Sequence, residues 1–261
     1  MKIITVIILI LNLMLAGLVL AKDEHHIFTE ILQEYVKHGL VNYKKLCKDE
    51  RLEKYIQQLQ NTNPDTIADS KRQLAFWLNA YNAYTLKVIC DNYPVKSIND
   101  LHFGGLVIGT VLKKTIWDKP FVILGHKKYT LNQIEHKIIR PKFKDPRVHF
   151  ALVCAALSCP PLRSEAYEGD RLDEQLNDQG RKFFSDPQKN EFDLNQKIAH
   201  LSKILDWYEK DFGKNKEEVL LYISQFLPDE IASAIQEEPS AWQIKYKPYD
   251  WSLNEQKDGT N

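Results

Sequence analysis

Apolar residues recur at helical spacing along the first third of the chain. They follow this spacing over residues 27–36 and again over residues 43–60. Residues 71–89 form a third predicted helix, with Ser70 placed to cap its start, and apolar residues surround nearly its whole circumference. A helix that is apolar on every side is typical of a buried element. The pattern therefore predicts a helical N-terminal part built around one buried helix.

The pattern changes in the middle of the chain, where short apolar runs alternate with turn signals. Residues 121–131 carry Gly125-His126 between two such runs, which is typical of a two-residue β-hairpin. A capped helix is predicted over residues 131–140. The apolar run over residues 147–154 predicts a buried strand that leads into a turn. This region is therefore expected to supply most of the sheet.

The last third again mixes both periodicities. It predicts a helix over residues 170–184, a hairpin over 191–201, helices over 203–212 and 217–227, and a strand over 242–246. There is no regular alternation of strand and helix. The expected fold is therefore α+β, a single domain over residues 22–261 whose helical N-terminal part adjoins a mainly antiparallel central sheet flanked by helices.

The first 21 residues have a different character. Lys2 precedes a long apolar run that ends at Val19-Leu20-Ala21, and a polar chain follows. These features are typical of a secretory signal peptide cleaved after Ala21, and an uncleaved N-terminal anchor is the alternative. We therefore expect a secreted or periplasmic protein with no membrane span beyond this segment.

Composition narrows the classes of partner. The chain has 35 basic and 35 acidic residues, and 44% of its residues are hydrophobic. The hydrophobic content is that of a globular protein, and the balanced charge gives no basic surface for nucleic acid. The expected partner is an unidentified peptide, amide or glycan ligand, and the sequence does not predict an oligomeric state.

The four cysteines allow two interpretations. Cys154 and Cys159 are separated by four residues and are natural disulfide partners in an oxidising compartment, with Cys47 and Cys90 then joined or buried as free thiols. Alternatively, Cys159 is a nucleophile, in which case Cys154 stays reduced or pairs elsewhere.

The most reactive residue types lie together in R-V-H-F-A-L-V-C-A-A-L-S-C-P-P-L, residues 147–162. On a strand, His149 and Cys154 would point to opposite faces, whereas Cys159 lies past the strand and a turn could return it over His149. The imidazole would then hold the Cys159 thiol as a thiolate. The alternative is a Cys154–Cys159 disulfide beside a core histidine. The spacing fits no common zinc pattern, so neither a metal nor a cofactor is expected.

Three further polar residues belong to the predicted site. Asn79 and Asn82 lie three residues apart on the buried helix and must have hydrogen-bond partners there. They would orient an imidazole or bind a substrate carbonyl, or else tie the helix to a neighbouring loop. Glu135 and His136 are adjacent and point about 100° apart on an α-helix, so one of them could reach His149.

Five ordered segments resemble the DUF547 family of bacterial and plant proteins. They read L-A-F-W-L-N-A-Y-N-A (74–83), L-N-Q-I-E-H-K-I-I-R (131–140), R-V-H-F-A-L-V-C-A-A-L-S-C-P-P-L-R (147–163), L-S-K-I-L-D-W-Y-E-K-D-F (201–212) and Y-D-W-S-L-N (249–254). This resemblance implies a family whose activity is unassigned. The chain is also loosely similar to papain and transglutaminase folds, but their nucleophilic cysteine lies near the start of the central helix. Here that helix offers Asn79 and Asn82.

Two functions follow from these residues. The first is an exported thiol-dependent hydrolase or acyl transferase acting on an amide or peptide bond. Cys159 would be its nucleophile and His149 its base, and Asn79, Asn82 or Glu135 would orient the base or stabilise an oxyanion. The second is a non-catalytic binding or assembly module with a structural Cys154–Cys159 disulfide, to which the aromatic segment 249–251 could contribute a ligand platform.

Overall fold

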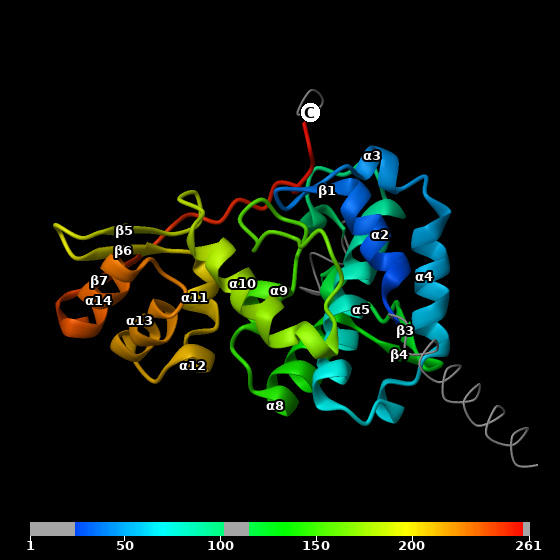
Figure 1. The fold of residues 1–261 in the computed structure, drawn as a ribbon. Coiled ribbons are helices and arrows are strands. Elements are labelled where there is room, and N and C mark those ends of the chain that lie inside the picture. The colour runs from blue at the N-terminus through cyan, green and yellow to red at the C-terminus, as the bar shows by residue number, and fades with distance from the viewer. Residues whose placement is uncertain (1–23, 102–114, 258–261) are drawn as a thin grey trace, which may run out of the picture.

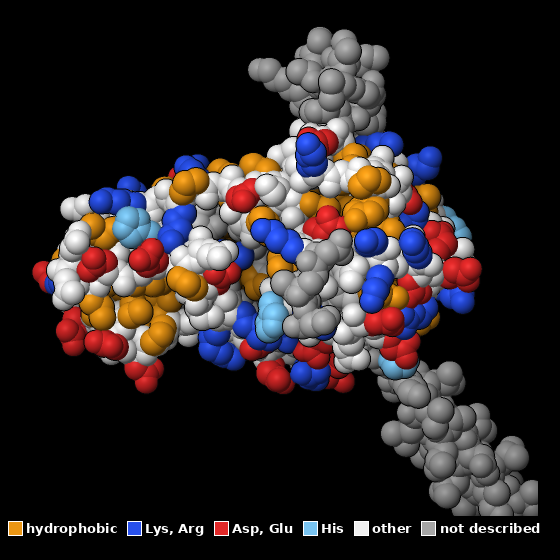
Figure 2. Space-filling model, turned by 90° about the horizontal axis from the view of Figure 1, so that it is seen from above, with side chains coloured by type: hydrophobic (Ala, Val, Ile, Leu, Met, Phe, Trp, Pro, Cys, Tyr) orange, Lys and Arg blue, Asp and Glu red, His pale blue; other side chains and the backbone are white. Residues whose placement is uncertain are grey.

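The computed structural model describes residues 24–101 and 115–257. The predicted signal peptide, residues 1–21, lies outside the described residues. Within the two described ranges, no helix has the length and hydrophobicity needed to cross a membrane. Figure 2 shows basic and acidic side chains interspersed over one face of the molecule, in keeping with the balanced charge of the chain.

The N-terminal part is helical, as predicted. Its elements are α2 (His26–Tyr35), α3 (Tyr43–Leu46), α4 (Glu50–Asn61), a 3₁₀ turn (Pro64–Thr66) and α5 (Ser70–Cys90). The helix predicted over residues 43–60 is split because Asp49 caps a new helix, its side chain accepting the Arg51 N–H. Asp69 rather than Ser70 caps α5, by accepting the Arg72 N–H.

Helix α5 is the buried centre of this part (Figure 1). Every side chain from Gln73 to Leu86 is buried, and α4 packs along the helix with α2 beyond it. Complete burial of a leucine or phenylalanine contributes about 1.5–3 kcal/mol, so a helix with buried side chains on all sides anchors the elements around it. The predicted buried helix is confirmed.

The strands form three small sheets, so the α+β class is confirmed although no single central sheet forms within the described residues. The sheets are β1 (Val36–Lys37) with β2 (Leu40–Val41), β3 (Val122–Leu124) with β4 (Lys127–Tyr129), and β5 (Glu191–Asp193), β6 (Ile198–Leu201) and β7 (Gln243–Tyr246) in that order. All pairs are antiparallel except β6 with β7. The predicted Gly125-His126 turn is present, and both residues have the positive φ that a two-residue hairpin turn needs.

The prediction of a strand over residues 147–154 is wrong. Residues Val148–Ala151 form the short helix α9, and the chain becomes extended only from Leu152. Asp145 starts this helical turn, because its side chain accepts the Arg147 N–H at 3.0 Å and its carbonyl accepts the Val148 N–H at 3.2 Å. The division of side chains between two strand faces, derived from that prediction, is therefore also wrong.

The helix predicted over residues 131–140 exists but is not uniformly α-helical. It consists of α7 (Leu131–Gln133), a π-helical segment (Ile134–Ile139) and α8 (Arg140–Phe143). The predicted capping box is present, with the Thr130 side chain accepting the Gln133 N–H and the Gln133 side chain accepting the Thr130 N–H. Short π segments occur frequently at functional sites.

The C-terminal part adds helices around the three-stranded sheet. They are α10 (Leu172–Phe184), α11 (Lys203–Trp207), α12 (Glu209–Phe212), α13 (Lys216–Ser224) and α14 (Asp229–Glu237). These elements enclose a second hydrophobic cluster, in which Phe150 from α9 packs against Phe183 and Phe212. The larger cluster surrounds α5. Helix α9 and the segment that follows it therefore lie between the two clusters.

Candidate functional site

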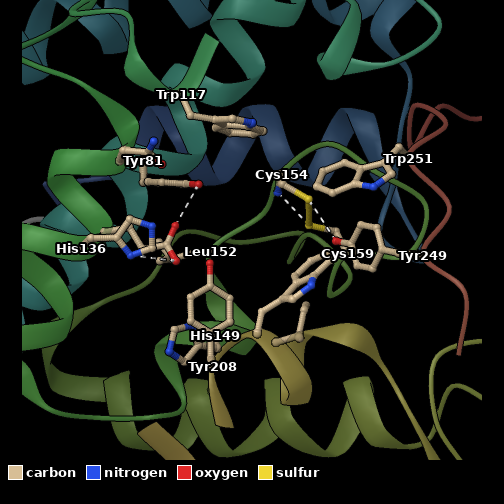
Figure 3. A pocket seen from close by; sticks show the side chains of 14 residues that line it. Tyr81, Trp117, His136, His149, Leu152, Cys154, Cys159, Tyr208, Tyr249 and Trp251 are labelled. Carbon is tan, nitrogen blue, oxygen red and sulfur yellow. Dashed lines mark hydrogen bonds and ion pairs between the residues drawn. A yellow bond between two sulfur atoms is a disulfide. The ribbon is translucent and has the colours of Figure 1, made fainter. Parts of the chain in front are cut away.

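A cavity of about 270 Å³ opens between the two hydrophobic clusters (Figure 3). Its walls come from α5, the helical segment over residues 131–143, α9, α11 and the C-terminal segment. The lining residues are Tyr81, Trp117, Asn132, Glu135, His136, His149, Leu152, Cys154, Cys159, Ile204, Trp207, Tyr208, Tyr249 and Trp251. Concave sites lined by aromatic side chains and a few polar groups are typical of ligand pockets.

The two cysteines of the central segment form part of the wall as a disulfide (Figure 3). The backbone N–H of Cys154 donates to Cys159 Sγ at 2.8 Å, and the Tyr249 hydroxyl lies 3.2 Å from Cys154 Sγ. Cys47 and Cys90 form a second disulfide, so no described cysteine is a free thiol. Of the two interpretations left open by the sequence, the structure has the Cys154–Cys159 disulfide and not a free Cys159 thiol.

Glu135 and His136 both line the pocket, although adjacent residues on an α-helix would diverge. The π-helical segment that contains them widens the helical turn, which reduces the angle between neighbouring side chains. The Glu135 side chain is only 9% exposed, and its carboxylate accepts the Tyr81 hydroxyl at 3.4 Å. Burial, with the charge of Glu135, raises the pKa of Tyr208 far above its usual range, so its hydroxyl is a donor at neutral pH.

His149 is held by a group that the sequence did not point to. Its Nε2 lies 2.7 Å from Asp211 Oδ2, and Arg140 binds the same carboxylate through two hydrogen bonds. The hydrogen bond from His149, with those from Arg140, holds the pKa of Asp211 well below its usual range. An ionised carboxylate can only accept, so His149 Nε2 carries a proton. The imidazole is also stacked on Tyr208, with ring centroids 3.9 Å apart.

Three aromatic rings meet at one side of the pocket. Trp207 is 48% exposed, and its ring centroid lies 4.8 Å from that of Tyr249 and 5.9 Å from that of Trp251. The Tyr249 and Trp251 centroids are 4.6 Å apart. A half-exposed tryptophan beside two further rings offers a ligand a flat apolar surface at the opening of the cavity.

Asn79 and Asn82 are placed differently from the rest of the predicted site. The Asn79 amide exchanges two hydrogen bonds with the backbone of Tyr167, both of 2.8 Å. Asn82 donates to the Ala151 carbonyl and accepts the Val153 N–H, both at 2.9 Å. Neither lines the pocket, so the structure brings Glu135, His149 and Cys159 together and uses the two asparagines to bind backbone segments to α5.

Sequence reasoning missed Asp211 and the aromatic contribution of α11. Both lie in the segment D-W-Y-E-K-D-F (206–212), for which the sequence predicts a helix and a family resemblance but no site residue. The only signal in the sequence is composition, because this short segment holds two adjacent aromatic residues, Trp207 and Tyr208, and three acidic residues. Across the described ranges, no group of three or more His, Cys, Asp or Glu side chains is arranged to hold a metal ion.

Comparison with known proteins identifies one family. Residues 65–184 match the model of DUF547, described as a protein of unknown function. No curated protein and no solved structure matched the chain significantly. The matched range contains α5, the π-helical segment and the disulfide segment, and ends with α10.

Proposed function

We propose that this chain, which belongs to the DUF547 family through residues 65–184, is an exported binding protein whose pocket holds a small ligand against aromatic rings. The observation that carries the proposal is the half-exposed Trp207, grouped with Tyr249 and Trp251 at a cavity of about 270 Å³. Such rings stack on flat apolar groups while nearby hydroxyls supply hydrogen bonds. The ligand would be a peptide, amide or glycan group.

Two features support export as part of this proposal. The apolar run after Lys2 ends at Val19-Leu20-Ala21, the pattern of a signal peptide. Disulfides persist in oxidising compartments, and the described cysteines form two of them. In this reading the Cys154–Cys159 bond fixes the shape of the pocket wall.

The test is a ligand screen followed by one substitution. The screen follows tryptophan fluorescence during titration with short peptides, simple amides and oligosaccharides, and calorimetry then measures the affinity of any compound that binds. Trp207→Ala should weaken that affinity by about 2- to 12-fold, the value of a stacked aromatic contact.

Leu221→Ala is the matched control, since Leu221 is 41% exposed on α13 and does not line the pocket. The Leu221→Ala variant should bind the ligand with the same affinity as the unsubstituted protein. Affinity that is unchanged by Trp207→Ala would place the ligand elsewhere and contradict the proposal, as would a screen in which nothing binds.

One observation favours a second candidate, the thiol-dependent hydrolase or acyl transferase. The Cys154 N–H points at Cys159 Sγ from 2.8 Å, and in the reduced protein this donor would stabilise a Cys159 thiolate inside the pocket. His149, oriented by Asp211, would be the base. Among the described residues no hydrogen bond joins His149 to either sulfur, so this reaction requires both reduction and a rearrangement.

Alkylation distinguishes the two candidates. In the binding protein, iodoacetamide without reductant should add no mass to the folded chain, because all four cysteines are paired. Intact-mass spectrometry measures the result, and the same reaction after denaturation and reduction is the positive control. Rapid labelling of Cys159 in the folded protein, at a pH below the usual thiol pKa of about 8.5, would instead support the thiol enzyme.

A further inference from the structure

The charge inside the pocket is one-sided. Among the described residues that line it, Glu135 is the only carboxylate and none is Lys or Arg. The hydroxyl of Tyr81 donates to this carboxylate at 3.4 Å, which orients the carboxylate without neutralising it. The charge of Arg140 acts on Glu135 through space, but no described Lys or Arg contacts the carboxylate. A buried carboxylate without a contacting cation is costly, and a ligand that brings a positive charge reduces that cost.

The neighbouring basic groups are already occupied. Arg140 forms two hydrogen bonds with Asp211, at 2.6 and 2.9 Å, and its third nitrogen lies 3.0 Å from His136 Nδ1. A guanidinium can only donate, so His136 Nδ1 must accept and the imidazole is neutral in this arrangement. The 3.9 Å approach of His136 to Glu135 is therefore not an ion pair.

The aromatic walls of the pocket also favour a cation, in addition to the Glu135 carboxylate. Six of the lining residues are tyrosine or tryptophan, and Figure 3 shows Tyr81 and Trp117 facing the cavity across from Tyr249 and Trp251. The faces of such rings carry negative potential and attract ammonium groups, above all in desolvated sites. Glycans and neutral amides would benefit from the rings but not from the Glu135 charge.

We infer that the pocket selects an alkylammonium group, seated between the aromatic rings with Glu135 as its counter-ion. The inference rests on the proposed function and specifies the ligand of the same pocket. A quaternary ammonium and a primary ammonium, such as a lysine side chain, share this chemistry. Quaternary groups gain mainly from the rings, whereas a primary ammonium also donates hydrogen bonds to the carboxylate.

The test compares cations with neutral molecules of the same shape. Choline is titrated against 3,3-dimethylbutan-1-ol, in which carbon replaces the charged nitrogen, and pentylammonium is titrated against pentan-1-ol. Tryptophan fluorescence and calorimetry give the dissociation constants for the full chain. We expect at least one cation to bind about tenfold or more tightly than its neutral partner, the scale of a desolvated cation–π site. For each pair we compare the affinity of the cation with that of its neutral partner. The pair with the larger ratio shows whether the pocket prefers a quaternary or a primary ammonium group.

Glu135→Gln supplies the second arm. The amide keeps the size of the side chain and an acceptor for Tyr81 but removes the charge, so cation affinity should fall about tenfold or more while the neutral partners keep theirs. Glu230 is an exposed carboxylate on α14, so Glu230→Gln is the matched control. It should change neither the affinity for the cations nor the affinity for the neutral partners. Near-ultraviolet circular dichroism verifies that each variant is folded.

The possible failures are separable. Equal affinity for cations and neutral partners would overturn the alkylammonium inference and leave the binding pocket intact. A retained cation preference in folded Glu135→Gln would also overturn it, because the charge would then come from elsewhere. If none of the four compounds binds, the inference fails, and only the wider screen of peptides, amides and oligosaccharides then decides whether the proposed function fails with it.

Discussion

Replacing Cys47 and Cys90 by alanine should lower the free energy of unfolding by about 4 kcal/mol, the value of the loop-entropy relation for a loop of this length. The two residues are 43 positions apart, and their disulfide joins the end of α3 to the end of α5. All of α4 lies inside the loop that the bond closes. The unfolded chain without the bond gains many conformations, whereas the folded chain changes little.

The Cys154–Cys159 pair provides an internal comparison. It closes a separation of only 5 residues, for which the same relation gives about 2 kcal/mol. Equilibrium urea denaturation without reductant measures both double alanine variants against the unsubstituted chain. The total free energy of unfolding of a folded domain is only about 5–15 kcal/mol, so the loss in the Cys47/Cys90 variant should be readily measurable. Equal losses of unfolding free energy in the two variants, or a larger loss in the Cys154/Cys159 variant, would contradict the prediction that the Cys47–Cys90 disulfide stabilises the fold more.

Asn82→Ala should destabilise the fold by about 2–6 kcal/mol, because it leaves two buried backbone groups without partners at about 1–3 kcal/mol each. Asn82 is 2% exposed, and its amide binds the Ala151 carbonyl and the Val153 N–H. These groups flank Leu152, so the substitution also loosens the chain that forms the pocket wall. Urea denaturation and hydrogen exchange at Val153 measure the two effects.

Asn61→Ala, at the exposed end of α4, is the control and should change stability by less than about 0.5 kcal/mol, as surface substitutions usually do. If Asn82 acted directly on a ligand, as the sequence also allowed, its loss would reduce binding and leave the unfolding free energy nearly unchanged. That outcome would contradict the structural role that its two backbone contacts indicate.

Local signals were sufficient for much of the fold. The all-round apolar character of residues 71–89 identified the buried helix, and Gly125-His126 located the β3–β4 hairpin, because both depend on residues close in sequence. The strand prediction over residues 147–154 failed for a local reason too. A short apolar run is compatible with a buried helix as well as with a strand. Here the turn that Asp145 starts favours the helix.

The site was harder to predict than the fold because its contacts are distant in sequence. His149 and Asp211 are 62 positions apart, and Cys154 meets Tyr249 from 95 positions away. Neither spacing leaves a periodic signal in one sequence. The central segment was identified because His149, Cys154 and Cys159 are unusual in an apolar run, whereas Trp207 and Tyr208 looked like ordinary helix residues.

The π-helical segment over residues 134–139 makes the pocket depend on the number of residues in that helix as well as on their identity. A π segment is an α-helix carrying one additional residue, accommodated as a local widening. Deleting an exposed residue there, such as Lys137, would restore regular α-helical winding and leave the flanking helices α7 and α8 in nearly the same register, because the widening already compensates for the additional residue. Glu135 and His136 would then diverge by about 100°, as adjacent residues of a regular α-helix do, although no pocket residue is substituted. Relatives that differ by a single deletion at this point would therefore differ in the polar groups that their pockets present.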